Sequence, residues 1–271
     1  MKPKRGLIWG ATAFVSSLFP AAGQWLTYPT AGVPRTPDGK PNLSAPAART
    51  PDGTPDLSGL WEMAHNRPCA PEGCADQQTS QEFINIGWSF KDGLPYRPWA
   101  AELVKTRTPE KRLTDPLSHC LPIGLVRLHT FVGFKKITQT PRLVVILYEY
   151  NASYRQIMTD GRPLPADPNP SWNGYSSGKW EGDTLVVETT GFRDDHWLDI
   201  SGTPASDAMR ITERFRRVNY GNLEIELTVD DPKTYTKPWT VKLHQTLKLD
   251  TDLLEYMCLE NEKDIRHLVS K

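Results

Sequence analysis

Hydrophobic and polar residues alternate along several short segments in the second half of the chain, and residues 239–249 are the clearest case. Polar residues, His244 among them, occupy the even-numbered positions of this segment, and the odd-numbered positions are mostly apolar. A period of two places alternate side chains on opposite faces of a β-strand, so we predict a strand with one buried face and with His244 in solvent. The apolar face holds Trp239, Val241, Leu243, Leu247 and Leu249.

Similar patterns predict strands elsewhere in the chain. Residues 142–150 form a continuous apolar run, which indicates a strand buried on both faces. Turn-forming residues at 181–183 and 219–221 join neighbouring strands as hairpins. The other predicted strands are residues 59–61, 154–159, 175–180, 184–190, 209–218, 222–229 and 253–258.

This set of elements predicts a mainly β fold with a few short helices, one of them at residues 98–107. About eight strands joined mostly by hairpins form either an antiparallel up-and-down barrel or a sandwich. We favour the barrel, because closing the sheet removes exposed strand edges in a chain with few helices to cover them.

The N-terminus has the pattern of a signal peptide. Lys2, Lys4 and Arg5 precede an apolar run at residues 6–19, and small residues follow at 21–23. A membrane anchor is the alternative, but the run is shorter than the roughly 20 residues that span a bilayer. We therefore expect residues 1–23 to be removed, which makes the protein periplasmic or secreted without stable membrane insertion.

Residues 24–58 are rich in proline and contain a short repeat. Residues 35–44 read RTPDGKPNLS, and residues 49–58 read RTPDGTPDLS. We interpret this segment as an extended arm that wraps the barrel or a neighbouring subunit of a homo-oligomer, with a disordered linker as the alternative. Residues 59–271 then form the barrel domain.

Composition narrows the range of functions. The chain has 32 basic and 32 acidic residues and no basic stripe, which argues against nucleic acid as a partner. It lacks a glycine-rich phosphate loop and a Gly-x-Ser-x-Gly motif, so hydride transfer, phosphoryl transfer and classical serine hydrolysis are disfavoured. We expect no cofactor.

Four cysteines remain after the signal peptide, and an even number in an exported chain favours disulfides. Cys69 and Cys74 flank a turn-prone stretch, so a local bridge between them leaves Cys120 to pair with Cys258. The alternative is a zinc site, but Cys120 and Cys258 lack the paired spacing of zinc ligands. We therefore predict two disulfides and no metal.

Carboxylates on apolar strand faces are the main candidates for catalysis. Glu213 shares its face with apolar residues, Glu188 lies on a face with Val186, and Glu149 ends the most apolar strand. A carboxylate inside a barrel must be paired or must shift its pKa, which makes it a candidate general acid or base. A structural ion pair with an arginine such as Arg155 is the alternative.

Hairpin geometry places further polar residues beside these carboxylates. Arg155 follows the connection after Glu149, Tyr175 is expected roughly opposite Glu188, and His196 and Asp199 leave the same strand end in a loop. This loop could also bind a metal or be a plain polar loop. If the protein is an enzyme, we expect its working groups among Glu149, Arg155, Tyr175, Glu188, His196, Asp199 and Glu213.

Aromatic residues concentrate around the same strands, where they either fill the core or line a pocket for a small aromatic or apolar molecule. Three classes of function follow: a cofactor-independent lyase or isomerase, a non-catalytic binding protein, or a structural or partner-binding envelope protein. The candidate ligand-binding residues are Tyr148, Tyr154, Trp172, Trp180, Trp197 and His119, the last being the neighbour of Cys120.

Several long motifs resemble those of a family of exported bacterial proteins of largely unassigned function. They are TDGRPLP at 159–165, GKWEGDTLVVETTGF at 178–192, ERFRR at 213–217 and DDPKTY at 230–235. The resemblance covers most of the chain after the signal peptide. By analogy it implies a lipocalin-like barrel, and it assigns no catalytic residues.

Overall fold

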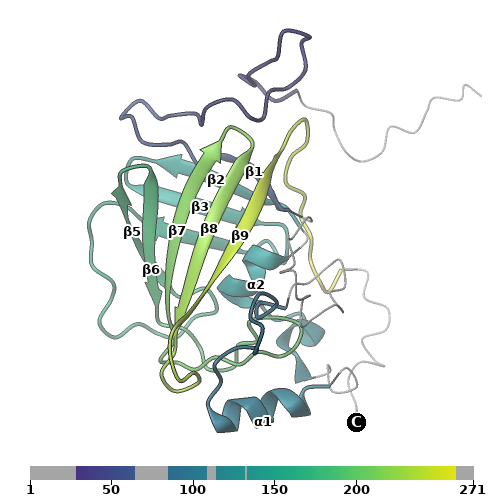
Figure 1. Ribbon diagram of the computed structural model, residues 1–271, viewed down its shortest axis with the longest axis vertical. Helices are drawn as coiled ribbons and strands as arrows, with labels where there is room; N and C mark the ends of the chain where they lie inside the picture. Colours follow the sequence, from purple (N-terminus) through teal and green to yellow (C-terminus); the bar gives the residue numbers. More distant parts are fainter. Residues whose placement is uncertain (1–28, 65–84, 109–113, 132, 261–271) are drawn as a thin grey trace, which may run out of the picture.

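The protein is a closed β-barrel of nine strands (Figure 1) in a computed structural model that describes residues 29–64, 85–108, 114–131 and 133–260. The strands follow each other around the barrel in chain order, and β9 pairs with β1 to close it. They are β1 (Gly59–Met63), β2 (Lys135–Thr140), β3 (Leu143–Tyr148), β4 (Tyr154–Met158), β5 (Tyr175–Glu181), β6 (Thr184–Thr190), β7 (Arg210–Asn219), β8 (Asn222–Asp230) and β9 (Trp239–Lys248).

The barrel thus has one strand more than expected, and two predictions about individual segments are wrong. Residues 253–258 form no strand and make a single bridge between Tyr256 and Tyr150. The run at 142–150 is not buried on both faces, because β3 is a wall of the barrel with its outer face at the surface. Val144 and Ile146 are 1% exposed, whereas Leu147 is 37% exposed.

One junction departs from the predicted antiparallel arrangement. β4 and β5 run parallel and are joined by two residue pairs, Ile157 with Ser176 and Met158 with Ser177. The other neighbouring strands pair in antiparallel fashion. Parallel neighbours require a connection that returns the chain to the starting end, and residues 159–174 supply it. With two residue pairs, this seam is the shortest strand pairing of the barrel.

Among the described residues, two α-helices and one short 3-10 helix accompany the barrel: α1 (Pro98–Thr106), η2 (Pro116–His119) and α2 (Gly124–Thr130). The predicted helix at 98–107 is confirmed as α1. All seven residues of α2 are buried, and the helix lies within one end of the barrel (Figure 1). It therefore fills space that would otherwise be open to solvent.

The proline-rich arm packs on its own barrel across the end that carries the β5–β6 and β7–β8 turns, where the Tyr220 and Gly221 amides donate to arm carbonyls (Figure 1). Both repeats form the same turn, closed by bridges from Arg35 to Pro41 and from Arg49 to Pro55. Arg49 reaches Asp183 in the β5–β6 turn at 2.8 Å. A role of the arm in joining subunits stays a prediction.

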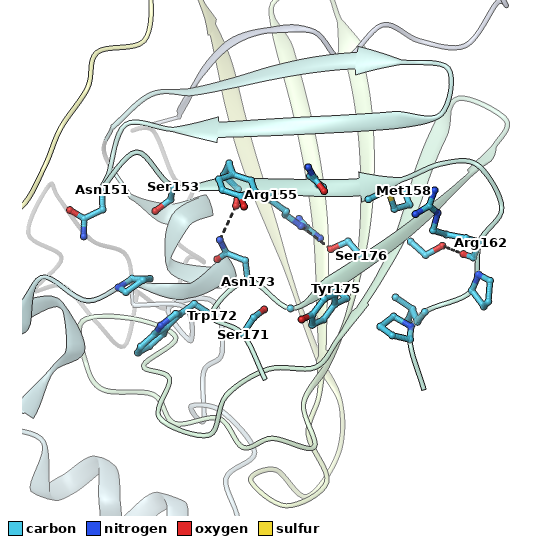
Figure 2. Close-up of a pocket in the computed structure, with 18 of the residues that line it drawn as sticks. Asn151, Ser153, Arg155, Met158, Arg162, Ser171, Trp172, Asn173, Tyr175 and Ser176 are labelled. Carbon is cyan, nitrogen blue, oxygen red and sulfur yellow. Dashed lines mark hydrogen bonds between the residues drawn. The ribbon is translucent and has the colours of Figure 1, made fainter. Parts of the chain in front are cut away.

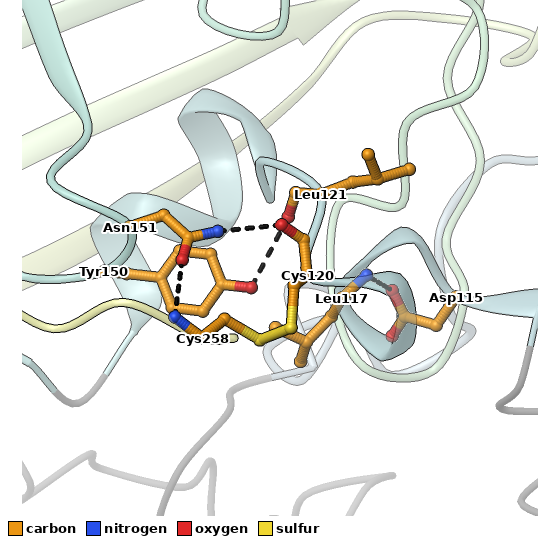
Figure 3. Close-up of a disulfide and its surroundings, with 7 residues drawn as sticks. All are labelled: Asp115, Leu117, Cys120, Leu121, Tyr150, Asn151 and Cys258. Atoms are coloured by element: carbon orange, nitrogen blue, oxygen red, sulfur yellow. Dashed lines mark hydrogen bonds between the residues drawn. A yellow bond between two sulfur atoms is a disulfide. The ribbon is translucent and has the colours of Figure 1, made fainter. Parts of the chain in front are cut away.

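A disulfide between Cys120 and Cys258 ties the segment after β9 to the loop before α2 (Figure 3), as the sequence predicts. Its Cα atoms are 5.4 Å apart, and 138 residues separate the two cysteines. Asn151 donates to the Cys120 carbonyl and accepts from the Cys258 amide, both at 2.9 Å. The expected pair Cys69–Cys74, like the signal peptide, lies outside the described residues.

Candidate functional site

A cleft opens in the barrel wall where β4 and β5 meet, and we call it the seam cleft (Figure 2). Strand alternation points Tyr154 and Gln156 of β4 and Tyr175 and Ser177 of β5 outward. Because two residue pairs alone join the strands, the wall is not continuous on the side of Tyr154. The result is a cavity of about 730 Å³.

The connection between β4 and β5 forms the rim of the seam cleft. Residues 162–165 line one side, and residues 171–174 line the other. Two hydrogen bonds join the rim to the strands: Asn173 donates to the Tyr154 carbonyl at 3.1 Å, and Ser177 donates to the Arg162 carbonyl at 2.7 Å. The long motif at 159–192 therefore builds this cleft.

Three aromatic side chains line the seam cleft, and two of them face solvent. Tyr154 is 63% exposed and Tyr175 is 38% exposed. Trp172 is half-buried, with the Arg193 guanidinium 5.0 Å from its ring and the His196 ring 5.3 Å away. The two tyrosines thus offer ring surface to a ligand, while Trp172 forms a supported wall.

Arg155 and Arg162 are the two charged residues that line the seam cleft, and each is already paired. Arg162 contacts Asp160 at 2.6 Å, and its hydrogen bonds lower the pKa of that carboxyl to about 2. Arg155 is 2% exposed, and its side chain runs inward to pair with Glu213. The cleft therefore presents little net charge.

Beneath the cleft, Arg155 joins a set of buried polar groups that we call the buried network. Its guanidinium donates to Ser176 Oγ at 3.0 Å, to Thr189 Oγ1 at 2.9 Å and to both carboxylate oxygens of Glu213. Glu213 also contacts His129 Nε2 at 2.7 Å through Oε1. The network comprises Arg155, Ser176, Thr189, Glu213 and His129.

The buried network holds α2 inside the barrel. His129 belongs to α2, and its backbone carbonyl accepts from Lys135 Nζ at 2.9 Å and from Gln245 Nε2 at 3.3 Å. These donors come from β2 and β9, whereas Glu213 comes from β7. One residue of the helix is thus bonded to three strands of the barrel.

Burial and pairing set the protonation states in the interior. Burial alone would raise the pKa of Glu213, but the charge of Arg155 and the hydrogen bond from His129 outweigh it and lower the pKa to about 2. Burial lowers the pKa of His129, and it lowers the pKa of Lys135 to about 7. Glu213 is therefore ionised at neutral pH and is bonded to a cation.

The structure separates the seven catalytic candidates. Glu213 points into the barrel, as the alternation of β7 predicts, and Arg155 contacts it. Glu188 points outward, contrary to expectation, because the inward row of β6 is Leu185, Val187 and Thr189. Tyr175 is not opposite Glu188: it pairs with Thr190, and Ser177 is opposite Glu188.

The remaining catalytic candidates lie apart from the buried network. Glu149 does not contact Arg155, and its carboxylate accepts from the Phe134 amide at 2.8 Å. Asp199 is buried, accepts from Thr203 Oγ1 at 2.7 Å, and has its pKa raised by burial. His196 packs on Trp172 and is not exposed at a barrel mouth, and burial lowers its pKa to about 4.

Among the ligand-binding candidates, Tyr154 and Trp172 line the seam cleft. Tyr148 is buried and faces the interior, where the charges of Arg155 and Glu213 act on it. The other three lie elsewhere: Trp180 packs on the core, Trp197 is buried under Arg107, and His119 is exposed in η2.

Sequence reasoning missed His129, Lys135 and Gln245, as well as Asn173 at the rim. Gln245 had a usable signal, because it occupies an apolar-face position of the predicted strand 239–249. His129 and Lys135 had none, because α2 was not foreseen and Lys135 begins a strand that the pattern did not delimit.

Within the described residues, no group of three or more His, Cys, Asp or Glu side chains could hold a metal ion, and no helix could cross a membrane. The predicted loop at 194–199 therefore shows no metal cluster. Comparisons with family models, with curated proteins and with solved structures found no match for this chain. The resemblance of its motifs to an exported bacterial family stays a prediction.

Proposed function

We propose that this protein is an exported small-molecule-binding barrel whose ligand lies in the seam cleft. The single observation that carries the proposal is the cleft itself, which is open to solvent and lined by exposed tyrosine rings. Its volume of about 730 Å³ lies within the range of small-molecule sites. Exposed apolar patches at a protein surface often mark a site that binds a ligand or a partner.

The lining favours a ligand with a flat apolar face, in line with the expected small aromatic or apolar molecule. Tyr154 and Tyr175 provide ring surface, and Leu164 and Met158 add aliphatic surface. Export is supported by the disulfide Cys120–Cys258, since such bonds persist in oxidising compartments.

A cofactor-independent acid–base enzyme, such as a lyase or isomerase, is the second candidate. One observation favours it: His129 is bonded to Glu213 through Nε2, and its Nδ1 has no hydrogen-bond partner among the described residues. A histidine held in this way has a nitrogen available as a base. Against this, His129 is fully buried, and the seam cleft meets the buried network at Arg155 and Ser176 rather than at His129.

Binding of N-phenyl-1-naphthylamine, an uncharged aromatic probe whose fluorescence rises in apolar sites, tests the first proposal. We expect the wild-type protein to bind it and the variant Tyr154→Ala/Tyr175→Ala to bind it much more weakly. Trp99→Ala is the control, because Trp99 is 49% exposed on α1 and does not line the cleft. Equal binding by the tyrosine variant, or no binding by the wild type, would overturn the proposal.

An NMR experiment tests the second candidate. A small molecule that binds the seam cleft is incubated with the wild-type protein and with His129→Gln, and its spectrum is followed over time. An acid–base enzyme would release product or exchange carbon-bound hydrogen with D₂O, and His129→Gln would stop this reaction. A ligand that is bound and never changed excludes catalysis on that ligand.

A further inference from the structure

Tyr154 and Tyr175 lie on the same outer face of two adjacent strands. Extending the register of the seam by one pair sets Gln156 beside Tyr175, so Tyr154 lies two residues further along β4. Two residues of a strand span about 7 Å. The tyrosines are therefore offset along the cleft by a length similar to that of one sugar ring, and are not stacked on each other.

The charges of the seam cleft are neutralised from within. Arg155 is bonded to Glu213 and Arg162 to Asp160, and the described residues that line the cleft include no carboxylate. A charged ligand would lose water on entering and would find no unpaired opposite charge. The cleft thus favours an uncharged ligand.

Polar side chains without partners lie among the aromatic ones. Gln156 and Ser153 line the cleft, and neither side chain makes a hydrogen bond to another described residue. Asn173 donates through Nδ2, while its Oδ1 has no hydrogen-bond partner in the described part of the chain. A purely apolar ligand would cover Gln156 and Ser153 and leave their polar atoms unsatisfied, which would weaken its binding.

From these observations we infer that the ligand of the seam cleft is a short uncharged saccharide, which has flat apolar faces but is not a purely apolar molecule; the assignment rests on the proposed role of the cleft as a binding site. A pyranose ring carries C–H groups on its faces and hydroxyl groups around its edge. The faces pack on Tyr154 and Tyr175, and the hydroxyl groups pair with the solvent-facing Gln156 and Ser153. Both kinds of lining group are then satisfied by one molecule.

Isothermal titration and saturation-transfer NMR of the whole exported chain test this assignment. The probes are cellobiose, maltose and lactose as uncharged disaccharides, cellobiouronic acid as a charged relative, and indole as an uncharged aromatic without hydroxyl groups. We expect an uncharged disaccharide to bind, to displace N-phenyl-1-naphthylamine, and to bind more tightly than cellobiouronic acid. Added salt should leave its affinity unchanged.

Variants assign the binding to the seam cleft. Tyr154→Ala and Tyr175→Ala should each weaken disaccharide binding by about tenfold through lost ring contact. Gln156→Ala should weaken it through lost hydrogen bonds and should leave indole binding unchanged. Trp99→Ala is the control and should bind as the wild type does. Circular dichroism checks that each variant is folded.

The outcomes distinguish the saccharide assignment from the proposed role of the cleft as a binding site. If indole and N-phenyl-1-naphthylamine bind in a tyrosine-dependent way and no disaccharide does, the saccharide assignment is wrong and the proposed function stands. A preference for cellobiouronic acid also overturns the assignment, because the cleft would then recognise charge. If no probe depends on Tyr154 or Tyr175, both proposals fail.

Discussion

The seam cleft and the buried network lie on opposite sides of the same barrel wall, and they satisfy their polar groups in opposite ways. In β4, Tyr154 and Gln156 point outward into the cleft, while Arg155 between them points inward to Glu213. In the cleft, the side chains of Gln156 and Ser153 make no hydrogen bond to another described residue and lie at a surface that water reaches. In the interior, Glu213 is 0% exposed and bonded to two partners.

We expect this difference to separate the stability of the barrel from the proposed binding of a ligand. A buried ion pair with most of its hydrogen bonds made is costly to break and has little capacity left for a ligand. An open cleft with exposed rings and solvent-facing polar side chains contributes little to folding and offers these groups to a ligand. We therefore expect changes in the network to alter stability and changes in the cleft to alter binding.

The largest expected effect is on stability, from Glu213→Gln. The substitution leaves the Arg155 guanidinium buried without its counter-charge, which costs about 3–5 kcal/mol. Urea unfolding at pH 7 measures the loss. The control is Glu188→Gln on the outer face of β6, for which we expect a change within about 0.5 kcal/mol. Equal stabilities of Glu213→Gln and the wild type would mean that the network does not hold the barrel together.

The lowered pKa of Glu213 also predicts that the protein loses stability at acid pH. The pKa of Glu213 is about 2 in the folded protein, against an ordinary value of 4.5. The folded state therefore binds the proton less readily than the unfolded state, so this contribution is complete above about pH 4.5 and is lost as the pH falls toward 2. The free energy of unfolding of Glu213→Gln should therefore depend less on pH over this range than that of the wild type.

Lys135→Met should raise the free energy of unfolding by nearly as much as Glu213→Gln lowers it. Burial lowers the pKa of Lys135 from 10.5 to about 7, and a tenfold change in proton affinity corresponds to about 1.4 kcal/mol. After the loss of the hydrogen bond to the His129 carbonyl, which contributes about 1 kcal/mol, we expect a gain of about 4 kcal/mol below pH 7.

The sign of the pH dependence sharpens this prediction. Because the folded state releases the Lys135 proton first, wild-type stability rises between about pH 7 and 10.5, and the advantage of Lys135→Met disappears across that window. Lys136→Met is the control, since Lys136 is a partly exposed neighbour paired with Asp252. A variant that is less stable than the wild type at pH 6 would contradict the prediction.

Removing the Cys120–Cys258 disulfide should lower both stability and probe binding, and the expected loss of stability is smaller than for Glu213→Gln. Cys120→Ser/Cys258→Ser should lose about 2–4 kcal/mol, because the bridge closes a long loop. Asn151, which lines the cleft, is bonded to both cysteines, so probe binding should also weaken. Unchanged binding by the variant would show that Asn151 is positioned without the bridge.

The smallest effect on stability is expected from Tyr175→Ser in the cleft. Tyr175 is 38% exposed, so we expect a change of about 0.5 kcal/mol or less in the free energy of unfolding. Binding of N-phenyl-1-naphthylamine should nevertheless drop sharply. A large loss of stability would break the comparison, because the cleft would then be part of the folding core.

Local sequence patterns determined much of the barrel. Alternation along 209–218 and 239–249 predicted β7 and β9 and the inward side of Glu213, since a period of two follows from strand geometry alone. Turn residues predicted the hairpins at 181–183 and 219–221, and the cysteine count predicted the Cys120–Cys258 bridge.

Tertiary structure decided which groups meet. The parallel seam depends on how residues 159–174 cross the barrel, and no local pattern encodes that path. His129, Arg155 and Glu213 come from α2, β4 and β7, so their contact exists only once the barrel has closed around the helix. Glu188 was misplaced for a related reason: alternation groups residues into two faces, and packing decides which of the two faces is inside.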